Sequence, residues 1–442
     1  MPCSPLAALF DGSRAAETPV AVVAGELRTF EAFDRATAAV AARVEERGGQ
    51  RWLLALDEAW AFSVGFFGLL RAGRSVAIPP NHLPATLDRL RPQVDGILTE
   101  LPEPGPQPRA PERLTDASIT FWTSGSSGEA KAVEKRLSQL SAEVDLLETT
   151  FSHRFAGGPV LGTVPHQHIY GCLFRILWPL AAGRPWVAEP CGDPDRLGHV
   201  MAVHPAPALV SSPALLSRLP DLVDLDAFAS QASVIFSSGG PLKRADALRW
   251  RSWVKEGVAE IYGSTESGGI AWRVQDEAPE SDQWTPFPDV TLETESDGAF
   301  RVRSFRAGDQ PLRMEDALEA TTQGRFRLRG RLDRIVKLEE KRLSLPEMEA
   351  ALESHPSVRQ AALVLLEGRR KALGAVVVLN HAVDDETRRT LGQAFRRHLA
   401  KHFEAVLLPR RWRFVESLPF DERGKLTVQA LAALFATGES CS

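Results

Sequence analysis

The sequence is poor in cysteine and tyrosine and has no long hydrophobic run. Its four cysteines are widely spaced over 442 residues, so neither a disulfide framework nor a zinc site is indicated. The longest apolar-leaning stretch, WAFSVGFFGLL at 60–70, has about half the length that a membrane span requires. The formal net charge of −5 is small, which argues against a dedicated nucleic-acid binder.

The N-terminus lacks the basic and apolar regions of a secretory signal, so we expect a cytoplasmic protein. Hydrophobic residues make up 44% and charged residues 25% of the chain, as in ordinary soluble proteins. A mass of 48.4 kDa is too large for one ordinary core. We therefore expect two or three domains.

Short apolar runs alternate with helical segments through most of the chain. A helical pattern at 27–49 ends in two glycines. Short apolar runs follow at 51–57, 75–80, 95–100, 118–122, 158–165, 206–212, 232–240 and 258–263. This alternation predicts a large α/β N-terminal domain, residues 1–332, in which parallel sheets are covered by helices.

The pattern changes near Asp333. From there on, the order of runs predicts a small α+β domain, residues 333–442, with a helix expected at 384–403. Apolar residues recur every four positions along that helix, which indicates one buried face. This domain carries a net positive charge, whereas the rest of the chain is net negative.

A run of small and polar residues, TSGSSGEAK at 123–131, follows the apolar stretch SITFW. Gly125 and Gly128 let the main chain approach a ligand closely, and successive N–H groups in such a loop form an anion site. Thr123 adds a hydroxyl donor and Lys131 a positive charge, so a polyphosphate is the natural ligand. The spacing differs from that of G-x-x-x-x-G-K-[ST], and the run alone also fits a flexible Gly/Ser loop.

Further motifs follow in order: TVPHQHIYG (163–171), SSGGPL (237–242), IYGSTES (261–267), GRLDRIVKLEEKRLSLPEMEAAL (330–352) and SLPFDERGKLTVQAL (417–431). Together with TSGSSGEAK they resemble the adenylate-forming superfamily over essentially the whole chain. That superfamily comprises acyl- and aryl-CoA synthetases, peptide-synthetase adenylation domains and luciferases. The resemblance implies a large AMP-binding domain, a small mobile C-terminal α+β domain, and the cofactors ATP and Mg²⁺. It also implies a reaction that makes an acyl-AMP and then a thioester.

The resemblance assigns roles to individual residues. ATP and AMP would be bound by Thr123, Ser124, Gly125, Ser126, Ser127, Gly128, Lys131, Gly239, Gly240, Tyr262, Gly263, Ser264, Asp316 and Arg331. The catalytic residues would be Thr265, Glu266 and Lys425. Asp333 would be the hinge of a domain rotation. The acyl pocket would include His168, Tyr170, Ser238, Gly239, Ile270 and Ala271.

The chemistry of these residue types agrees with the roles. Glu266 offers the hard oxygen that Mg²⁺ prefers, and Lys425 offers a cation for charge at the α-phosphate. The ring of Tyr262 suits a purine, and a carboxylate at Asp316 can accept from both ribose hydroxyls, with Glu315 as a rival. The alternatives are core packing for Tyr262, a structural histidine at 168 and an ordinary surface lysine at 425.

Two positions depart from the family pattern. Ala130 stands where proline often precedes the loop lysine, and Glu340 stands where glycine is more usual, near the expected pantetheine path. The short chain is similar to stand-alone ligases of aryl-polyene and polyketide clusters of secondary metabolism. Those enzymes load hydroxybenzoate- or cinnamate-type acids onto the phosphopantetheine of an acyl carrier protein.

The resemblance therefore implies an acid–thiol ligase with a small-molecule carboxylate as substrate and an acyl carrier protein as partner. A basic lobe around the 384–403 helix would attract an acidic carrier, although a solvated helix face explains the same charges. The alternatives are a ligase that uses free CoA for aryl or fatty acids, and a non-catalytic nucleotide-binding regulatory protein.

Overall fold

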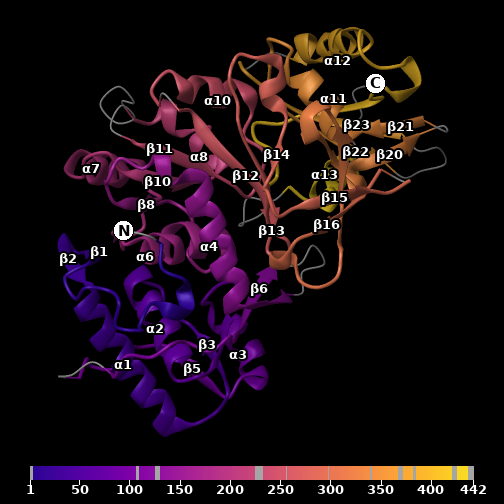
Figure 1. The fold of residues 1–442 in the computed structure, drawn as a ribbon. Coiled ribbons are helices and arrows are strands. Elements are labelled where there is room, and N and C mark those ends of the chain that lie inside the picture. The colour runs from indigo at the N-terminus through magenta and orange to yellow at the C-terminus, as the bar shows by residue number, and fades with distance from the viewer. Residues whose placement is uncertain are drawn as a thin grey trace. The chain divides into compact units, whose positions relative to one another are not determined.

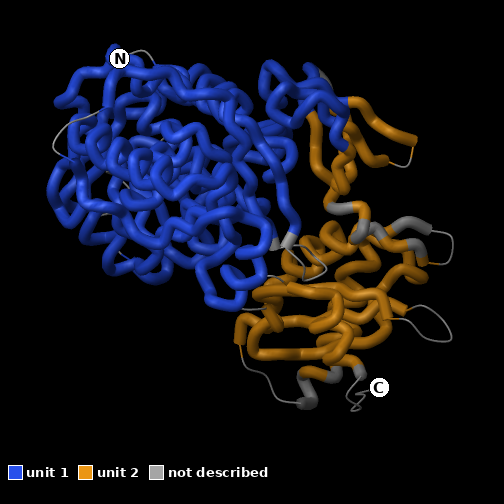
Figure 2. Tube along the Cα trace, turned by 90° about the horizontal axis from the view of Figure 1, so that it is seen from below, with its two compact units in different colours: residues 1–292, 302–312, 323–325 blue, residues 293–301, 313–322, 326–442 orange. Residues whose placement is uncertain are grey.

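The computed structural model describes residues 3–105, 109–124, 130–223, 232–254, 256–296, 298–338, 341–366, 372–381, 385–420 and 426–436. The chain forms two compact units (Figure 2). Unit 1 contains residues 1–292, 302–312 and 323–325, and unit 2 contains residues 293–301, 313–322 and 326–442. The domain boundary expected near Asp333, between residues 1–332 and 333–442, stays a prediction, and so does the role of Asp333 as a hinge.

Two sheets form the frame of unit 1 (Figure 1). Their strands are β1 Pro19–Val23, β2 Glu26–Thr29, β3 Arg51–Leu54, β4 Ser75–Ile78, β5 Gly96–Leu98, β6 Ser118–Ser124, β7 Ala130–Arg136, β8 Val160–Gly162, β9 Trp186–Val187, β10 Ala208–Ser211, β11 Val234–Ser237, β12 Val258–Ser264, β13 Gly268–Val274 and β14 Thr285–Pro286. The first sheet has the order β5-β3-β4-β6-β7, in which β7 is antiparallel to its neighbour and the other pairs are parallel.

The second sheet has the order β14-β13-β12-β11-β10-β8-β9-β1-β2. Its strands pair in parallel from β12 to β1, and the pairs at both ends are antiparallel. Parallel strands place their carboxyl ends at one edge, where ligands of α/β proteins usually bind. The motif segments after β8, β11 and β12 therefore begin at a common edge.

Helices cover these sheets. They are α1 Phe30–Arg47, α2 Ala59–Arg71, α3 Pro84–Leu90, α4 Leu137–Phe151, α5 Ile169–Gly171, α6 Trp178–Ala182, α7 Pro194–Val203, α8 Pro213–Leu216 and α10 Arg244–Arg251, with a π-helix at Cys172–Leu177. The largest hydrophobic core joins α1, α2 and α4 to both sheets. On the other face of the second sheet, Leu209 and Ile235 pack with Leu197 of α7 and Trp250 of α10. Parallel sheets covered by helices confirm the expected α/β class.

Unit 2 has a smaller α+β core. Its elements are β18 Asp316–Ala320, β19 Phe326–Arg331, β20 Ile335–Leu338, β21 Lys341–Ser344, α11 Leu345–Glu353, β22 Val358–Leu366, β23 Ala372–Leu379, α12 Asp385–Leu399, β24 Arg411–Phe414 and α13 Val428–Ala436. The strands β22, β23 and β24 form one sheet. Phe395 and Leu399 of α12 are fully buried in the adjoining core, which confirms the apolar face expected on that helix.

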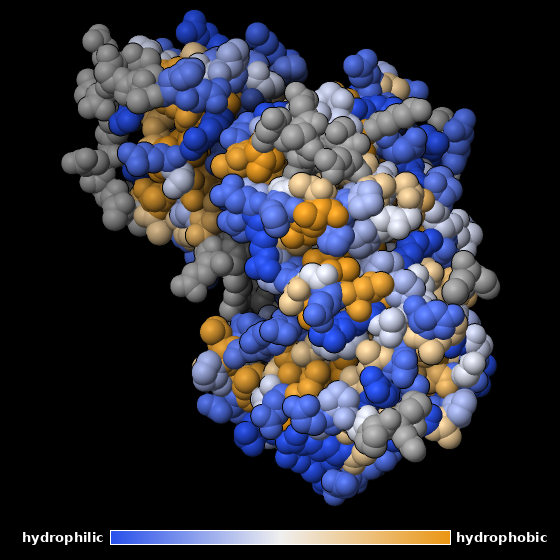
Figure 3. Space-filling view, turned by 90° about the vertical axis from the view of Figure 1, so that its left-hand side faces the viewer, coloured by the Kyte–Doolittle hydropathy of each residue, from blue (hydrophilic) through white to orange (hydrophobic). Residues whose placement is uncertain are grey.

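A three-stranded sheet consists of β15 Thr291–Thr294, β16 Phe300–Arg303 and β17 Leu312–Met314, and its residues are divided between the units. Within the described part of the chain, no helix has both the length and the apolar character needed to cross a bilayer. On the face drawn in Figure 3, hydrophobic residues form patches interspersed with hydrophilic ones.

Candidate active site

The strands on either side of the TSGSSGEAK loop lie at the antiparallel edge of the first sheet. Thr123 and Lys131 are direct partners in the register of β6 and β7, and Thr123 Oγ1 donates to the Lys131 carbonyl over 3.3 Å. The side chain of Lys131 is largely exposed. The predicted loop residues outside the described part of the structure are Gly125, Ser126, Ser127, Gly128 and the side chain of Ser124.

The predicted catalytic pair Thr265 and Glu266 lies in a tight turn between β12 and β13. A Cβ atom on Gly263 would lie 2.2 Å from the Gly268 carbonyl oxygen, so this position has room for glycine alone. Gly268 itself has a φ of +68°, in the left-handed region that favours glycine. Gly263 and Gly268 of IYGSTESGG are thus required by the shape of the turn.

Two serines close this turn from within. Ser264 N donates to Ser267 Oγ over 2.9 Å, and Ser267 N donates to Ser264 Oγ over 3.1 Å. Ser267 is completely buried. The reciprocal bonds fix the main chain that carries the two predicted catalytic side chains.

The predicted phosphate-binding lysine and the predicted metal ligand meet in the structure. Lys131 Nζ donates to Glu266 Oε1 over 2.8 Å. Burial by itself would raise the pKa of Glu266, but the hydrogen bond and charge of Lys131 outweigh it and hold the pKa below its usual range. Glu266 is therefore ionised at neutral pH.

An ionised Glu266 fits the needs of Mg²⁺. This ion commonly binds through one or two carboxylates together with substrate phosphates. Among the described residues, no group of three or more His, Cys, Asp and Glu side chains is placed to hold a metal alone. A site in which Glu266 would hold Mg²⁺ together with phosphate oxygens of ATP fits these residues, and the role of Glu266 as a metal ligand stays a prediction.

The predicted adenine-side residues lie directly after β11 and in the last part of β12, at the same edge of the second sheet. Ser238 Oγ donates to the Ile261 carbonyl over 2.9 Å and ties the two segments together. Tyr262 is half-buried, with its ring centroid 5.6 Å from that of Trp284. The exposed positions after Ser238 are Gly239 and Gly240.

The predicted acyl-pocket residues come from several elements. His168 is exposed just before α5, while burial raises the pKa of the Tyr170 hydroxyl, whose ring lies 4.8 Å from Phe174. Ile270 and Ala271 are fully buried in β13, where Ala271 is the direct partner of Tyr262. Their assignment to one acyl pocket, together with Ser238, stays a prediction.

The other predicted residues belong to unit 2. Asp316 and Arg331 are direct partners across β18 and β19, so the structure brings the two predicted ribose-side residues together along the backbone. Glu315, the rival of Asp316, is exposed. Asp333 lies in the short 3-10 turn between β19 and β20. Lys425 lies outside the described residues.

Three buried charged residues beside the Glu266 turn were missed by the sequence analysis. They are Lys135, Glu143 and Arg306, which are 4%, 4% and 2% exposed. Lys135 Nζ donates to the main-chain carbonyls of Glu266 over 2.6 Å and of Arg306 over 2.7 Å. Lys131 and Lys135 share one face of β7, because side chains alternate along a strand. Two lysines four apart in a strand were the available signal.

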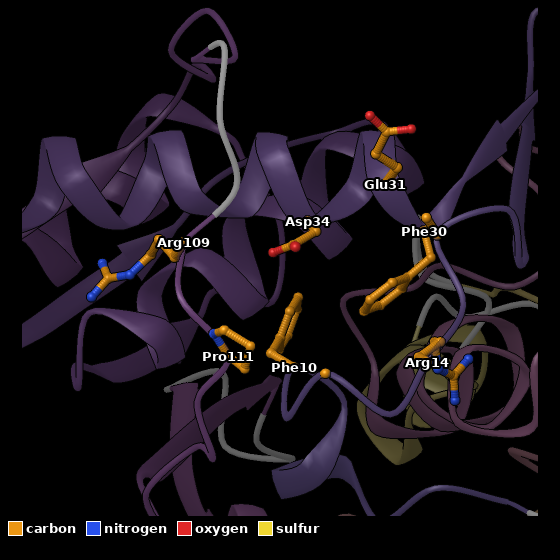
Figure 4. Close-up of a pocket in the computed structure, with 9 residues that line it drawn as sticks. Phe10, Arg14, Phe30, Glu31, Asp34, Arg109 and Pro111 are labelled. Carbon is orange, nitrogen blue, oxygen red and sulfur yellow. The ribbon is translucent and has the colours of Figure 1, made fainter.

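A cavity of about 150 Å³ lies elsewhere in unit 1. Its lining includes Phe10, Phe30, Asp34 and Arg109. In Figure 4 the two phenyl rings lie beside the cavity, and Glu31 points away from them. No residue predicted to bind the nucleotide or the acid belongs to this lining.

Comparisons with known proteins agree with the motifs. A family described as AMP-binding enzyme matches residues 80–295, and its C-terminal domain matches residues 347–425. The chain is 31% identical over 320 residues to a 4-coumarate–CoA ligase of Rhodobacter capsulatus, covering 71% of this chain and 76% of the relative. It is 24% identical over 352 residues to a 4-chlorobenzoate–CoA ligase of an Arthrobacter species, covering 72% and 66%. Its fold is similar to that of ATP-bound MatB from Rhodopseudomonas palustris, with a TM-score of 0.82 at 18% identity and 99% of both chains covered.

Proposed function

Because the chain belongs to the adenylate-forming superfamily of AMP-binding enzymes and is an AMP-forming acid–thiol ligase, we propose that its substrate is an aromatic carboxylic acid. In the first half-reaction, a carboxylate oxygen of the acid bonds to the α-phosphorus of ATP and pyrophosphate leaves. In the second, a thiol gives up its proton and attacks the acyl carbon, and AMP leaves. The observation that carries the first half-reaction is the contact between Lys131 and Glu266.

This contact supports a site for a metal–triphosphate complex. Lys131 is exposed enough to exchange its carboxylate partner for a phosphate oxygen when ATP binds. Glu266 would hold Mg²⁺, which would supply positive charge to the phosphates. Thr265 donates its hydroxyl to a phosphate oxygen, and Asp316 and Arg331 hold the ribose side.

Two observations support an aromatic acid. The two relatives described above are named ligases of 4-coumarate and 4-chlorobenzoate. The predicted acyl pocket also includes Tyr170, whose ring packs against Phe174. The proposed acid is therefore of hydroxybenzoate or cinnamate type.

Carboxylate-dependent ATP–pyrophosphate exchange tests this proposal. We expect exchange with 4-hydroxybenzoate or 4-coumarate and much weaker exchange with octanoate. Exchange with fatty acids alone would show that the aromatic assignment is wrong. No exchange with any acid of a broad panel would favour a nucleotide-binding regulatory protein.

For the thiol we propose the phosphopantetheine of an acidic acyl carrier protein, with free CoA as the alternative. Unit 2 supports this choice, because its basic residues include several exposed ones: Arg397, Lys401, Arg410 and Arg411. Such charges speed the encounter with an acidic partner and are screened by salt.

The acceptor is tested by comparing turnover on a holo-carrier protein and on free CoA as salt rises. The variant R397E/K401E should slow transfer to the carrier at low salt and leave pyrophosphate exchange unchanged. R91E, which changes an exposed arginine of unit 1, is the matched control. Turnover with CoA alone, insensitive to salt, would contradict the carrier assignment.

The same proposal gives Lys425 a role in the first half-reaction only. Lys425→Ala should abolish most pyrophosphate exchange, because charge at the α-phosphate loses its cation. Thioester formation from supplied acyl-adenylate should continue. Equal loss of both steps would refute this division of labour.

A further inference from the structure

The turn that carries Glu266 rests on a cluster of buried charges. Lys135 lies on β7, Glu143 on α4 and Arg306 in the short 3-10 segment between β16 and β17, and each is at least nine-tenths buried. Burying a charge costs free energy unless it is paired and hydrogen-bonded. Burial accordingly lowers the pKa of Lys135 to about 8. The hydrogen bonds of these three side chains offset the cost of burying their charges, and their partners indicate the role of the cluster.

The ammonium group of Lys135 donates hydrogen bonds to main-chain carbonyls rather than to a carboxylate. Its Nζ atom lies 2.6 Å from the Glu266 carbonyl oxygen and 2.7 Å from the Arg306 carbonyl oxygen. The bond to Glu266 joins residues 131 positions apart in the chain. The lysine thus connects β7, which follows the phosphate loop, to the turn with the predicted metal ligand.

The other end of the turn is held by the two remaining members of the cluster. Gly269 N donates to Glu143 Oε1 over 2.8 Å, and Arg306 Nη1 donates to the Gly269 carbonyl over 2.5 Å. Arg306 Nη1 also reaches Glu143 Oε2 at 3.0 Å, and its other nitrogens bind the Asp289 carboxylate at 2.8 and 3.0 Å. The main chain of the segment from Glu266 to Gly269 is therefore held at one end by Lys135 and at the other by Glu143 and Arg306.

We propose that Lys135 is a positioning residue for Glu266, holding its main chain in place so that the carboxylate stays aimed when Lys131 leaves it for a phosphate. Lys131 holds the side chain of Glu266 and Lys135 holds its backbone. Binding of ATP removes the first contact and spares the second. The inference rests on the proposed function in one respect, the role of Glu266 as a ligand of ATP-bound Mg²⁺.

The test measures how much Mg²⁺ strengthens the binding of a non-hydrolysable ATP analogue, by calorimetry with Mg²⁺ and with EDTA. Lys135→Met should reduce the gain from Mg²⁺ by at least about tenfold, since loss of a group that orients a metal ligand typically costs 10–100-fold in metal affinity. Its affinity for the metal-free analogue should stay within about twofold of wild type. In the exchange assay, the Mg²⁺ concentration for half-maximal rate should rise, and saturating Mg²⁺ should restore most of the rate.

Arg273→Met is the matched control. Arg273 forms a partly buried pair with Glu260 on the same β12–β13 hairpin, with two nitrogen–oxygen distances of 2.9 Å, and its Nη1 donates to the Asp282 carbonyl rather than to the Glu266 turn. This variant should lose stability and keep the full Mg²⁺ gain. If Lys135→Met does not fold, Lys135→Gln decides: its amide keeps two N–H donors but is one atom shorter than the lysine side chain, so an intermediate loss is expected.

The two hypotheses fail separately. A wild-type protein without carboxylate-dependent exchange would contradict the proposed function, and the binding comparison would still judge Lys135. An active wild type whose Lys135→Met variant keeps the whole Mg²⁺ gain would overturn the positioning role. So would an equal loss of Mg²⁺ gain in Arg273→Met, because the effect would then follow stability alone.

Discussion

His166 should make the free energy of unfolding of unit 1 depend on pH. Its side chain is buried in the loop after β8, with the ring centroid 4.7 Å from that of Phe62 and Nε2 at 3.5 Å from the Leu56 carbonyl oxygen. Burial, and next the nearby Arg175 guanidinium, lower its pKa to about 3 from an ordinary value of 6.5. The folded protein therefore keeps this histidine neutral well into the acid range.

The sign follows from which state takes up the proton first. Below about pH 6.5 His166 is protonated in the unfolded chain, whereas in the folded chain it stays neutral down to about pH 3. Acidification between these two pH values therefore favours unfolding. Each pH unit within the window is worth about 1.36 kcal/mol. Between pH 8 and about pH 5, His166 should lower the free energy of unfolding by about 2 kcal/mol.

Urea unfolding at the two pH values, followed by tryptophan fluorescence, measures this loss. The variant His166→Gln keeps a side-chain donor for Leu56 and cannot be charged, so its loss on acidification should be about 2 kcal/mol smaller than that of wild type. His199→Gln, at an exposed position of α7, is the matched control. Equal acid losses in wild type and His166→Gln would refute the reasoning.

Two further predictions concern the same unit, one a close main-chain contact and the other a buried ion pair. Gly171→Ala should reduce pyrophosphate exchange more than about tenfold, because the added Cβ would lie 2.0 Å from the main-chain oxygen of Pro165 and must displace the loop with the predicted acyl-pocket residues. Gly198→Ala, whose Cβ would meet nothing within 4 Å in α7, should instead raise the melting temperature slightly, and a similar exchange rate in both variants would contradict the steric argument. Arg306→Met should lower the free energy of unfolding by about 3 kcal/mol, since it leaves the buried Glu143 carboxylate without its guanidinium partner; a loss below about 1 kcal/mol in urea unfolding would show that the pair contributes little.

Much of the fold could be predicted because its signals are local. Apolar runs and glycine stops lie within a few residues of the elements they specify, and the parallel sheets and the buried face of α12 followed from them. The turn at Glu266 was also predictable as a motif, since a Cβ atom on Gly263 would clash with the Gly268 carbonyl inside the turn and Gly268 has a positive φ.

The support beneath that turn was not predictable in the same way. Lys135 and Arg306 are 171 positions apart and contact each other through a main-chain carbonyl, which leaves no periodic pattern in the sequence. A buried lysine in AKAVEKR also looks like any solvated strand residue until its partners are known. The contact between Lys131 and Glu266 is compatible with their predicted roles at one site, but nothing in the sequence indicated the hydrogen bond from Lys135 to the Glu266 main chain.

The contacts of Arg306 bear on the predicted hinge at Asp333. Residues 302–312 return to unit 1 between two stretches of unit 2, and Arg306 fastens them there through Glu143 and Asp289. Residues 302–312 precede the predicted hinge at Asp333 in the chain, so a bend at that position would leave the contacts of Arg306 unchanged. Truncated proteins should therefore differ in the support of the Glu266 turn. A protein that ends at residue 332 keeps the contacts of Arg306 with Glu143 and with the Gly269 carbonyl, whereas one that ends at residue 300 lacks Arg306.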